Sequence, residues 1–256
     1  MIGSRARSPV RRPDGCTEQA IAHGCRIMPG TLYLISLPIG NPDDISLRAL
    51  HILRSVATIA AENVHVVAPL LTHHGVHSPC ISYRKRSDRD TMAPILSRLE
   101  QGEDVALICD AGTPAIADPG HELARAAIAR DIPVEVVPGP VAATAALVVS
   151  GLPTGRFAFD GFPPRARADR SAFFRRLANE TRTILLYESA AGLRATLQDL
   201  ARVLPEERQI VLTCELTTPR QWIFRGTLRE ALAQCAPRVR PGRYTLVIAG
   251  HTLAPL

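Results

Sequence analysis

The chain has 256 residues, 46% of them hydrophobic and 4% aromatic, which is enough for one large or two medium domains with well-formed cores. Its formal net charge of +6, from 30 basic and 24 acidic residues, is a mild excess that does not by itself indicate a nucleic-acid partner. No apolar run approaches the roughly eighteen residues of a membrane span, and residues 1–28 lack the apolar segment of a secretory signal, so we expect a cytoplasmic protein.

The first segment, residues 1–28, carries five arginines against two acidic residues and shows no periodicity. This composition favours a disordered basic extension. Met28 stands directly before the first patterned segment and is an alternative translation start.

Strands alternate with helices from Thr31 onward, an order that is typical of a parallel α/β sheet. Strands are predicted over residues 31–37, 56–60, 80–83, 105–109 and 133–137. Helices are predicted over residues 46–54, 62–74 after a short loop, 91–101, 122–130 and 141–150. We expect Asp43 and Asp44 to cap the first of these helices.

The second half of the chain continues the alternation. Residues 157–159 form an apolar segment, strands are predicted over residues 183–187, 209–214 and 244–249, and helices over residues 167–179, 193–203 and 228–235. We therefore expect two α/β domains, residues 29–140 and 141–256, with a binding cleft between them.

The most informative loop is Asp110 to Gly120, which reads D-A-G-T-P-A-I-A-D-P-G. It follows a buried strand and precedes a helix, so it lies at the edge where open α/β sheets bind ligands. Its two glycines and two prolines fix an irregular backbone that can approach a ligand closely. Asp110 and Asp118 supply hydrogen-bond acceptors, although a tight turn with helix-capping aspartates is an alternative interpretation.

The first loop carries no phosphate-binding motif, since Pro38 to Asp44 matches neither G-x-G-x-x-G nor G-x-x-x-x-G-K-[ST]. Three loops, at residues 38–41, 110–120 and 138–139, instead have a backbone that a ligand can approach closely, and they carry few positive charges. They suit a ligand that has an amino-acid end and a nucleoside end but no phosphates. S-adenosylmethionine fits this description.

Longer motifs run in order from about Met28 to Gly250, and they are Gly30–Leu34 with Pro38–Asn41, Asp43–Leu50, Asp110–Gly120, Pro138–Pro140, Ser150–Thr154 and Gly161–Pro164. Together they resemble the tetrapyrrole methylase superfamily, and within it the branch that methylates the ribose 2′-hydroxyl of a cytidine in small-subunit (16S) ribosomal RNA. The resemblance implies a two-domain α/β enzyme with a mostly parallel N-terminal sheet and a mixed C-terminal sheet. It also implies a homodimer with S-adenosylmethionine in the interdomain cleft.

The resemblance further implies which residues contact the cofactor: Pro38, Gly40, Asp110, Ala111, Gly112, Thr113, Pro114, Ala115, Ile116, Pro138 and Gly139. Methyl transfer depends mainly on positioning, and a nearby base helps to remove the hydroxyl proton. Glu62 is the family-matched carboxylate for that role, and a solvent-facing or helix-capping Glu62 is the alternative.

The sequence departs from the family on the expected substrate side. After Glu62 the family has Asp-Thr-Arg, and this chain has Asn63-Val64-His65. After Tyr187-Glu188-Ser189 the family has Pro-His-Arg, and this chain has Ala190-Ala191-Gly192. Two alternatives to the ribosomal RNA methyltransferase therefore stay open: a methyltransferase for a tetrapyrrole-like or other small acceptor, and a silent paralogue that binds S-adenosylmethionine without turnover.

Two arginine-containing clusters are the candidate RNA-binding residues, namely Arg84, Lys85, Arg86, Arg165 and Arg167. The RNA hypothesis predicts that they lie on the face that holds the cleft mouth, whereas a solvated surface is the alternative. We expect no metal site and free thiols, because the six cysteines form no C-x-x-C pair and the cluster of His73, His74 and His77 has no matching carboxylate or thiol pattern.

Overall fold

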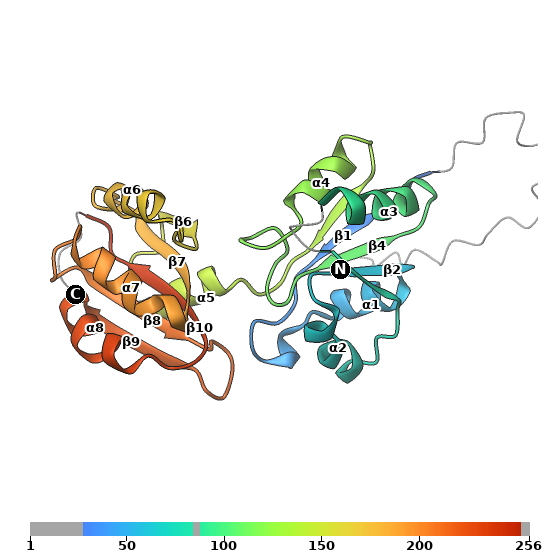
Figure 1. Ribbon diagram of the computed structural model, residues 1–256. Coiled ribbons are helices and arrows are strands. Elements are labelled where there is room, and N and C mark those ends of the chain that lie inside the picture. The colour runs from blue at the N-terminus through green and yellow to red at the C-terminus, as the bar shows by residue number, and fades with distance from the viewer. Residues whose placement is uncertain (1–27, 84–87, 252–256) are drawn as a thin grey trace, which may run out of the picture.

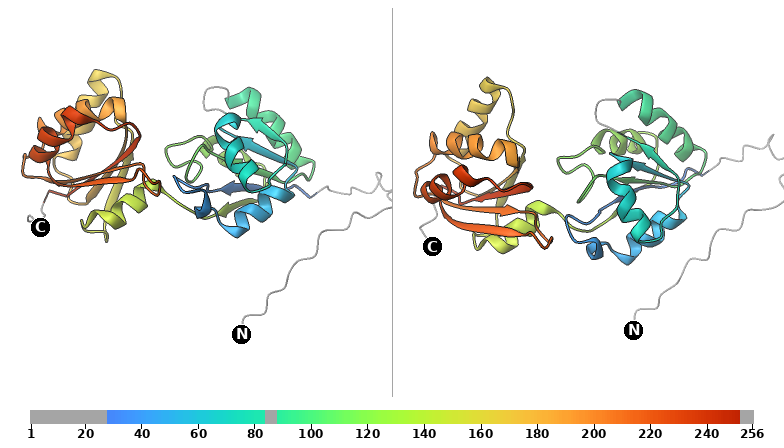
Figure 2. Two further views of the ribbon diagram at one scale, coloured as in Figure 1. Left: turned by 90° about the horizontal axis from the view of Figure 1, so that it is seen from below. Right: turned by 60° about the horizontal axis from the view of Figure 1, so that its bottom comes forward.

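The computed structural model describes residues 28–83 and 88–251. Within these residues, two five-stranded sheets form two lobes that lie side by side (Figures 1 and 2). The segment between β5 (Val134–Val137) and α5 (Ala142–Ser150) joins them, and the expected boundary between residues 140 and 141 falls in this segment. The expected extension over residues 1–28 lies, apart from Met28, outside the described residues.

The N-terminal sheet is parallel throughout and has the strand order β3-β2-β4-β1-β5. Its other strands are β1 (Leu32–Ile35), β2 (Thr58–Ala61), β3 (Cys80–Ser82) and β4 (Val105–Ile108). Every residue of β2 and β4 is buried, as expected for central parallel strands that are covered on both faces.

Helices cover both faces of this sheet (Figure 1). On one face, α1 (Leu47–Ser55) and α2 (Val64–His73) bury Leu53, Val67 and Leu71 against the sheet. On the other face, α3 (Asp88–Glu100) and α4 (His121–Ile128) bury their own set, which is Ile95, Leu96, Leu99, Leu123 and Ala127. The two cores hold the strand ends of the sheet in fixed positions.

The C-terminal sheet is mixed and has the strand order β6-β7-β10-β8-β9. Its strands are β6 (Phe157–Gly161), β7 (Thr183–Ser189), β8 (Gln209–Cys214), β9 (Trp222–Thr227) and β10 (Arg243–Ile248). The β6–β7 pair is parallel and the remaining pairs are antiparallel. The predicted class, an α/β fold with a parallel N-terminal and a mixed C-terminal sheet, is confirmed.

The C-terminal helices also divide between two faces. The residues of α6 (Arg167–Leu177), α7 (Ala190–Ala201) and α8 (Leu228–Gln234) share one core, which also contains the short 3-10 helix at Ala236–Arg238. On the opposite face, α5 packs Ala143, Ala146 and Leu147 against Leu185 and Val247. In the described part of the chain, no helix is both long and apolar enough to cross a bilayer.

Two details of the sequence prediction are wrong. Strand β9 was not predicted, because it is an edge strand whose residues are mostly half-buried and show no clean alternation of apolar and polar positions. Asp43 and Asp44 do not cap α1, since they belong to the 3-10 helix Pro42–Asp44. Ser46 occupies the capping position, where its hydroxyl accepts a hydrogen bond from the Ala49 amide at 3.1 Å.

Candidate functional site

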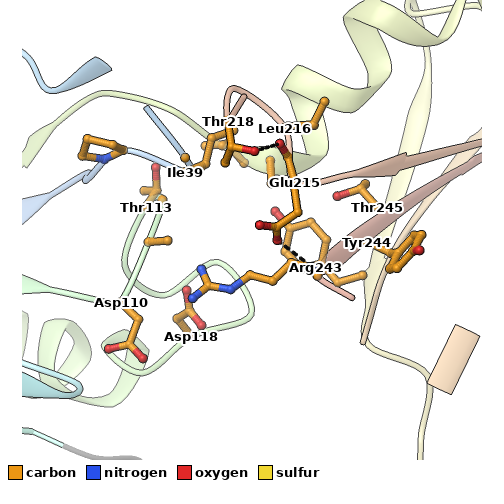
Figure 3. Close-up of a pocket in the computed structure, with 18 of the residues that line it drawn as sticks. Ile39, Asp110, Thr113, Asp118, Glu215, Leu216, Thr218, Arg243, Tyr244 and Thr245 are labelled. Atoms are coloured by element: carbon orange, nitrogen blue, oxygen red, sulfur yellow. Dashed lines mark hydrogen bonds between the residues drawn. The ribbon is translucent and has the colours of Figure 1, made fainter. Parts of the chain in front are cut away.

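A cavity of about 890 Å³ lies between the two lobes and is lined by residues of both (Figure 3). Its N-terminal wall comes from the loops that follow β1, β2 and β4 and from α2. Its C-terminal wall comes from β7, β8 and β10 with their adjoining loops, from the residue after β6 and from the start of α5. Ligand sites are commonly found at such domain junctions and at the carboxyl ends of parallel strands.

The topology of the N-terminal sheet explains the position of this cavity. The chain leaves β1 toward β2 on one side, and it leaves β4 toward β5 on the other, so the strand order reverses between the neighbouring strands β1 and β4. The loops that follow these strands meet at the reversal. There, the Leu37 amide donates to the Gly112 carbonyl at 2.9 Å, and the Gly112 amide donates to the Leu37 carbonyl at 3.1 Å.

Side chains strengthen this junction. The hydroxyls of Ser36 and Thr113 lie 2.8 Å apart, and Thr113 also donates to the Pro140 carbonyl at 3.2 Å. Thr113 therefore connects the loops after β1, β4 and β5. The three loops that the sequence assigned to a ligand site form one rigid edge.

The Asp110 loop is held in a strained backbone conformation. Gly112 has φ +77°, and the non-glycine residues Ala115 and Ala117 have φ of +69° and +65°. Left-handed conformations cost free energy for alanine and concentrate at functional sites. Asp110 itself carries a buried Oδ1 that has no hydrogen-bond partner among the described residues. A buried carboxylate oxygen without a partner is costly, so this atom marks a place for a ligand donor.

The predicted cofactor residues divide into two groups. Seven of them line the cavity: Pro38, Gly40, Asp110, Ala111, Gly112, Thr113 and Ile116. The other four, Pro114, Ala115, Pro138 and Gly139, lie in the same loops but outside the cavity wall. Gly139 has a packing role, since a Cβ there would fall 2.8 Å from the Ser36 Cβ.

Glu62 also lines the cavity, directly after β2. Partial burial raises the pKa of this carboxyl, and the nearby carboxylates of Asp118 and Asp110 raise it further. A hydrogen bond from the Asp110 backbone and the positive charge of Arg243 act in the opposite direction. A carboxylate with a raised pKa is a stronger proton acceptor than an ordinary one, which suits a general base.

The C-terminal wall contains residues that the sequence reasoning did not assign to the site. Figure 3 shows Arg243 extending from the start of β10 toward Asp118 and Asp110 on the opposite wall. Behind it, the Glu215 carboxylate accepts a hydrogen bond from the Arg243 amide at 3.0 Å. The same wall includes Tyr187, Leu216, Tyr244 and Thr245.

A second strained loop belongs to this wall. Glu215 and Thr217 have φ of +51° and +64°. The Asn41 amide donates to the Thr217 hydroxyl at 2.9 Å, so this loop contacts the loop after β1 in the other lobe. The Tyr187-Glu188-Ser189 motif, which this chain shares with the family, was the available sequence signal for this wall.

Two of the positions that depart from the family, Asn63 and Gly192, have clear local roles. Asn63 caps α2 by accepting a hydrogen bond from the His65 amide at 3.2 Å, a role that asparagine and aspartate perform about equally well. Gly192 leaves room for the Glu188 carboxylate, which a Cβ at this position would strike. Glu188 lines the cavity and accepts a hydrogen bond from Thr196 at 2.5 Å. The glycine thus accommodates a buried carboxylate in the cavity wall.

The structure describes two of the five candidate RNA-binding residues. Arg84, Lys85 and Arg86 lie outside the described residues. Arg165 and Arg167 are exposed and do not line the cavity, but they follow Phe162, which does. Across residues 28–83 and 88–251, no group of three histidine, cysteine or acidic side chains is arranged to hold a metal ion.

The hydrogen-bond acceptors in the cavity wall fit a ligand that has an ammonium group and hydroxyl groups. Asp110 offers an unused buried oxygen, and Glu62 and Asp118 add negative charge beside it. Apolar side chains such as Ile39, Leu216 and Val141 supply surface for a flat or aliphatic group. S-adenosylmethionine has all of these parts, so the residues present fit this cofactor.

Comparisons with known proteins agree with this site. Residues 31–232 match the model of the family described as Tetrapyrrole (Corrin/Porphyrin) Methylases. The ribosomal RNA small subunit methyltransferase I of Synechocystis sp. is 42% identical over 87% of this chain and 80% of its own length. The protein of the same name from Thermotoga maritima is 36% identical over 86% of this chain and 99% of its own length.

A solved structure shares the fold. The uroporphyrin-III-C-methyltransferase from Thermus thermophilus superposes with a TM-score of 0.63 at 22% identity, over 87% of this chain and 94% of that one. The family match covers most of the chain, and the curated relatives exceed 30% identity over most of their length. The chain therefore belongs to the tetrapyrrole methylase family, among the relatives of ribosomal RNA small subunit methyltransferase I.

Proposed function

We propose that the protein binds S-adenosylmethionine in the interdomain cavity and transfers its methyl group to ribosomal RNA. The observation that carries this proposal is the Asp110 loop, where a buried carboxylate oxygen without a partner meets the strained backbone of the topological switch point. Pro38, Gly40 and the residues Asp110–Thr113 with Ile116 would hold the cofactor. The bound cofactor supplies a methyl group that its sulfonium has already activated.

The acceptor that we propose is the ribose 2′-hydroxyl of a cytidine in small-subunit (16S) ribosomal RNA. The names of the curated relatives support RNA of the small subunit as the substrate. The exposed residues Arg165 and Arg167, near the Phe162 segment of the cavity wall, are available for phosphate contacts. Arg84, Lys85 and Arg86 stay part of the proposal as further phosphate contacts.

Glu62 would accept the hydroxyl proton. The site otherwise acts by positioning, because the methyl group needs only an aligned oxygen nucleophile. The raised pKa of Glu62 makes its carboxylate a stronger base than an exposed one, and it is nevertheless available in its ionised form above that pKa. Asp118 and Asp110 contribute to this basicity through their negative charge.

We also propose that the protein is a cytoplasmic homodimer, as the family resemblance implies. Two exposed apolar side chains on the N-terminal lobe support a contact surface: Leu47 is 77% exposed and Val136 is 56% exposed. The Arg48 guanidinium, from the residue next to Leu47, donates to the Val136 carbonyl. Sedimentation velocity tests this proposal, and a Leu47→Asp variant with the same mass as the wild-type particle would contradict the assignment of this surface.

The experiment that tests the enzymatic proposal is transfer of labelled methyl groups from S-adenosylmethionine to small ribosomal subunits. Subunits from a strain deleted for the gene are compared with wild-type subunits, which already carry the modification. We expect incorporation into the deletion subunits alone, at a cytidine ribose. Cofactor binding without incorporation into either would overturn the ribosomal assignment and would leave a small acceptor or a silent paralogue.

A further inference from the structure

Phe162 is an aromatic residue that is exposed and lies at the cavity. Its side chain is 55% exposed although it lines the cavity on the C-terminal lobe. Single exposed apolar side chains are common on protein surfaces, but one that also lines a ligand cavity is available to contact what binds there.

The backbone of β6 is shaped so that Phe162 is displayed. The pairing of β6 with β7 shifts register between Phe159 and Gly161, and Gly161 has φ +66°. An irregularity of this type re-aims the side chains that follow it and is common beside active sites. A glycine accepts this left-handed conformation without the cost that other residues incur.

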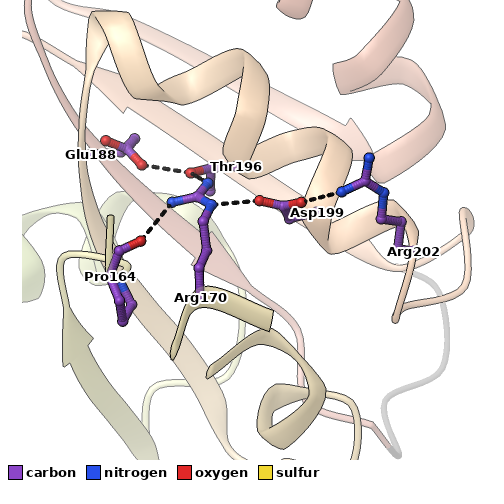
Figure 4. Close-up of polar contacts among 6 residues, drawn as sticks. All are labelled: Pro164, Arg170, Glu188, Thr196, Asp199 and Arg202. Atoms are coloured by element: carbon purple, nitrogen blue, oxygen red, sulfur yellow. Dashed lines mark hydrogen bonds and ion pairs between the residues drawn. The ribbon is translucent and has the colours of Figure 1, made fainter. Parts of the chain in front are cut away.

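A buried polar network fixes the segment that follows Phe162 (Figure 4). Arg170 of α6 donates to the Pro164 carbonyl at 3.3 Å, to Thr196 at 2.8 Å and to the Asp199 carboxylate at 2.5 Å. Thr196 in turn donates to Glu188, which lines the cavity. Arg170 and Asp199 are largely buried, with side-chain exposures of 18% and 19%. The display of Phe162 is therefore built into the fold of the lobe.

The ring itself has an aromatic support. Tyr187 meets Phe162 edge to face, with the ring centroids 5.5 Å apart, and Tyr187 contacts Phe159 in the same way at 4.8 Å. The Tyr187 hydroxyl oxygen accepts a hydrogen bond from the Ala143 amide at 3.1 Å. Aromatic pairs prefer this geometry. The ring is thus held in place from one side while more than half of its surface stays open to a ligand.

Positive charge follows this ring within five residues of the sequence. Arg165 and Arg167 are exposed, and neither forms an ion pair with any residue in the described ranges 28–83 and 88–251. An exposed aromatic ring next to free arginines is the combination by which proteins hold single-stranded RNA, since the bases stack on the ring and the phosphates contact the cations.

We propose that Phe162 is a stacking platform for a nucleobase of the acceptor RNA at the rim of the cavity. This inference rests on the proposed function and specifies how the RNA strand enters the site. Arg165 and Arg167 hold the adjacent phosphates. The network of Arg170, Thr196 and Asp199 positions the platform without touching the RNA.

The first test measures binding of a short cytidine-containing oligoribonucleotide to three variants of the full chain. We expect Phe162→Ala to weaken binding by roughly 5-fold to 150-fold, which is the equivalent of stacking one base. Phe162→Trp should retain binding because it keeps a stacking face. Phe157→Ala is the matched control: Phe157 is an aromatic residue of β6, the strand that precedes Phe162, and it is 41% exposed and does not line the cavity. It should bind like the wild type.

The second test detects the stacked base directly. In a Phe162→Trp, Trp222→Phe variant, residue 162 carries the only tryptophan, because the native chain has one. We expect the oligoribonucleotide to quench its fluorescence, and an oligomer with abasic riboses, which keeps the phosphates, to leave it unchanged. Equal quenching by both oligomers would show that no base reaches the ring and would overturn the inference.

Two further outcomes separate this inference from its alternatives. If Phe162→Ala loses affinity for S-adenosylmethionine and keeps its affinity for RNA, the ring holds the cofactor and the inference is wrong. If the wild-type protein transfers no methyl group to deletion-strain subunits while base-dependent quenching is seen, the stacking platform stands and the proposed acceptor fails. The two proposals therefore succeed or fail separately.

Discussion

In the proposed mechanism, Glu62 is the residue on which methyl transfer depends most directly. Replacing it with glutamine keeps its size and removes its ability to accept a proton. We expect Glu62→Gln to lower the single-turnover rate of methyl transfer by roughly 100-fold to 10,000-fold, the usual contribution of a positioned general base. Affinity for S-adenosylmethionine, measured by calorimetry, should stay close to that of the wild type. A variant that keeps the full rate would exclude Glu62 as the base.

The pH dependence of the rate provides an independent check on the same residue. Burial and the charges of Asp118 and Asp110 raise the pKa of Glu62, so protonation begins to remove the base at a higher pH than for an ordinary carboxyl. We expect the wild-type rate to fall on acidification with a midpoint above the ordinary glutamate pKa of about 4.3. The residual rate of Glu62→Gln should show no such midpoint.

The same shift predicts an effect on stability. A group whose pKa is higher in the folded than in the unfolded state stabilises the fold below its unfolded pKa, and it loses this contribution as the pH rises through the folded value. Above the folded pKa the wild type has lost this contribution, and the ionised Glu62 repels Asp118 and Asp110. Glu62→Gln should therefore be more stable than the wild type at neutral pH, and the difference should shrink on acidification. Urea unfolding at several pH values measures it, and a difference that grows toward acid pH would contradict this account.

At the level of single residues, the sequence predicted the N-terminal wall of the cavity better than the C-terminal wall. The Asp110 loop could be identified because its glycines, prolines and aspartates are typical of an irregular loop at the end of a strand. The orphaned oxygen of Asp110 and the charge of Arg243 opposite it could not be identified. Both depend on which side chains from another lobe reach the cavity, and no local pattern encodes that.

Arg170 links helix α6 to the neighbouring helix of the C-terminal lobe by polar contacts, in addition to the apolar core that the two helices share. Arg170 joins α6 to α7 through Thr196 and Asp199. Replacing it with methionine keeps the apolar stem but removes every hydrogen bond. We expect Arg170→Met to lower the free energy of unfolding by about 1–3 kcal/mol, because it leaves buried polar groups without a partner. Equilibrium unfolding in urea measures this change.

Arg202 supplies the matched control for this element. It also pairs with Asp199, at 2.6 Å, but its side chain is 74% exposed. Exposed ion pairs contribute little because water and salt screen them. Arg202→Met should therefore change the free energy of unfolding by less than about 1 kcal/mol. Equal losses in the two variants would show that burial of the Arg170 network does not matter to stability.

Most elements could be predicted because their hydrophobic patterns are consistent with the fold. Strands β2 and β4 are short apolar runs bounded by polar turns, and the helices between them carry apolar stripes that the sheet buries. Strand β9 could not be separated from a loop by pattern alone. It lies at the edge of the sheet and pairs only with β8, so burial imposes little alternation on its sequence.

The arrangement of the two lobes was predictable in outline and not in detail. Two alternating series of strands and helices indicate two domains and a cleft, and family motifs indicate which loops face it. The contact between the loop after β1 and the loop after β8 involves residues 176 positions apart in the chain. Such a contact follows from the packing of whole lobes. For this reason the sequence did not predict that Glu215 and Arg243 belong to the site.

Gly40 tests how far the site depends on that contact. A Cβ at residue 40 would strike the Leu216 carbonyl and would lie 2.6 Å from the Thr217 hydroxyl oxygen, both in the opposite lobe. We expect Gly40→Ala to push the two loops apart, to lower the free energy of unfolding by about 1–3 kcal/mol, and to weaken binding of S-adenosylmethionine. Urea unfolding and calorimetry measure the two effects.

Gly155 is the matched control, since a Cβ there meets no atom within 4 Å. Gly155→Ala should leave both the stability and the cofactor affinity close to those of the wild type. If Gly40→Ala loses stability and still binds the cofactor normally, the two walls act independently and the N-terminal loops alone hold the ligand. If both quantities fall together, the closed junction between the lobes is a requirement of the binding site.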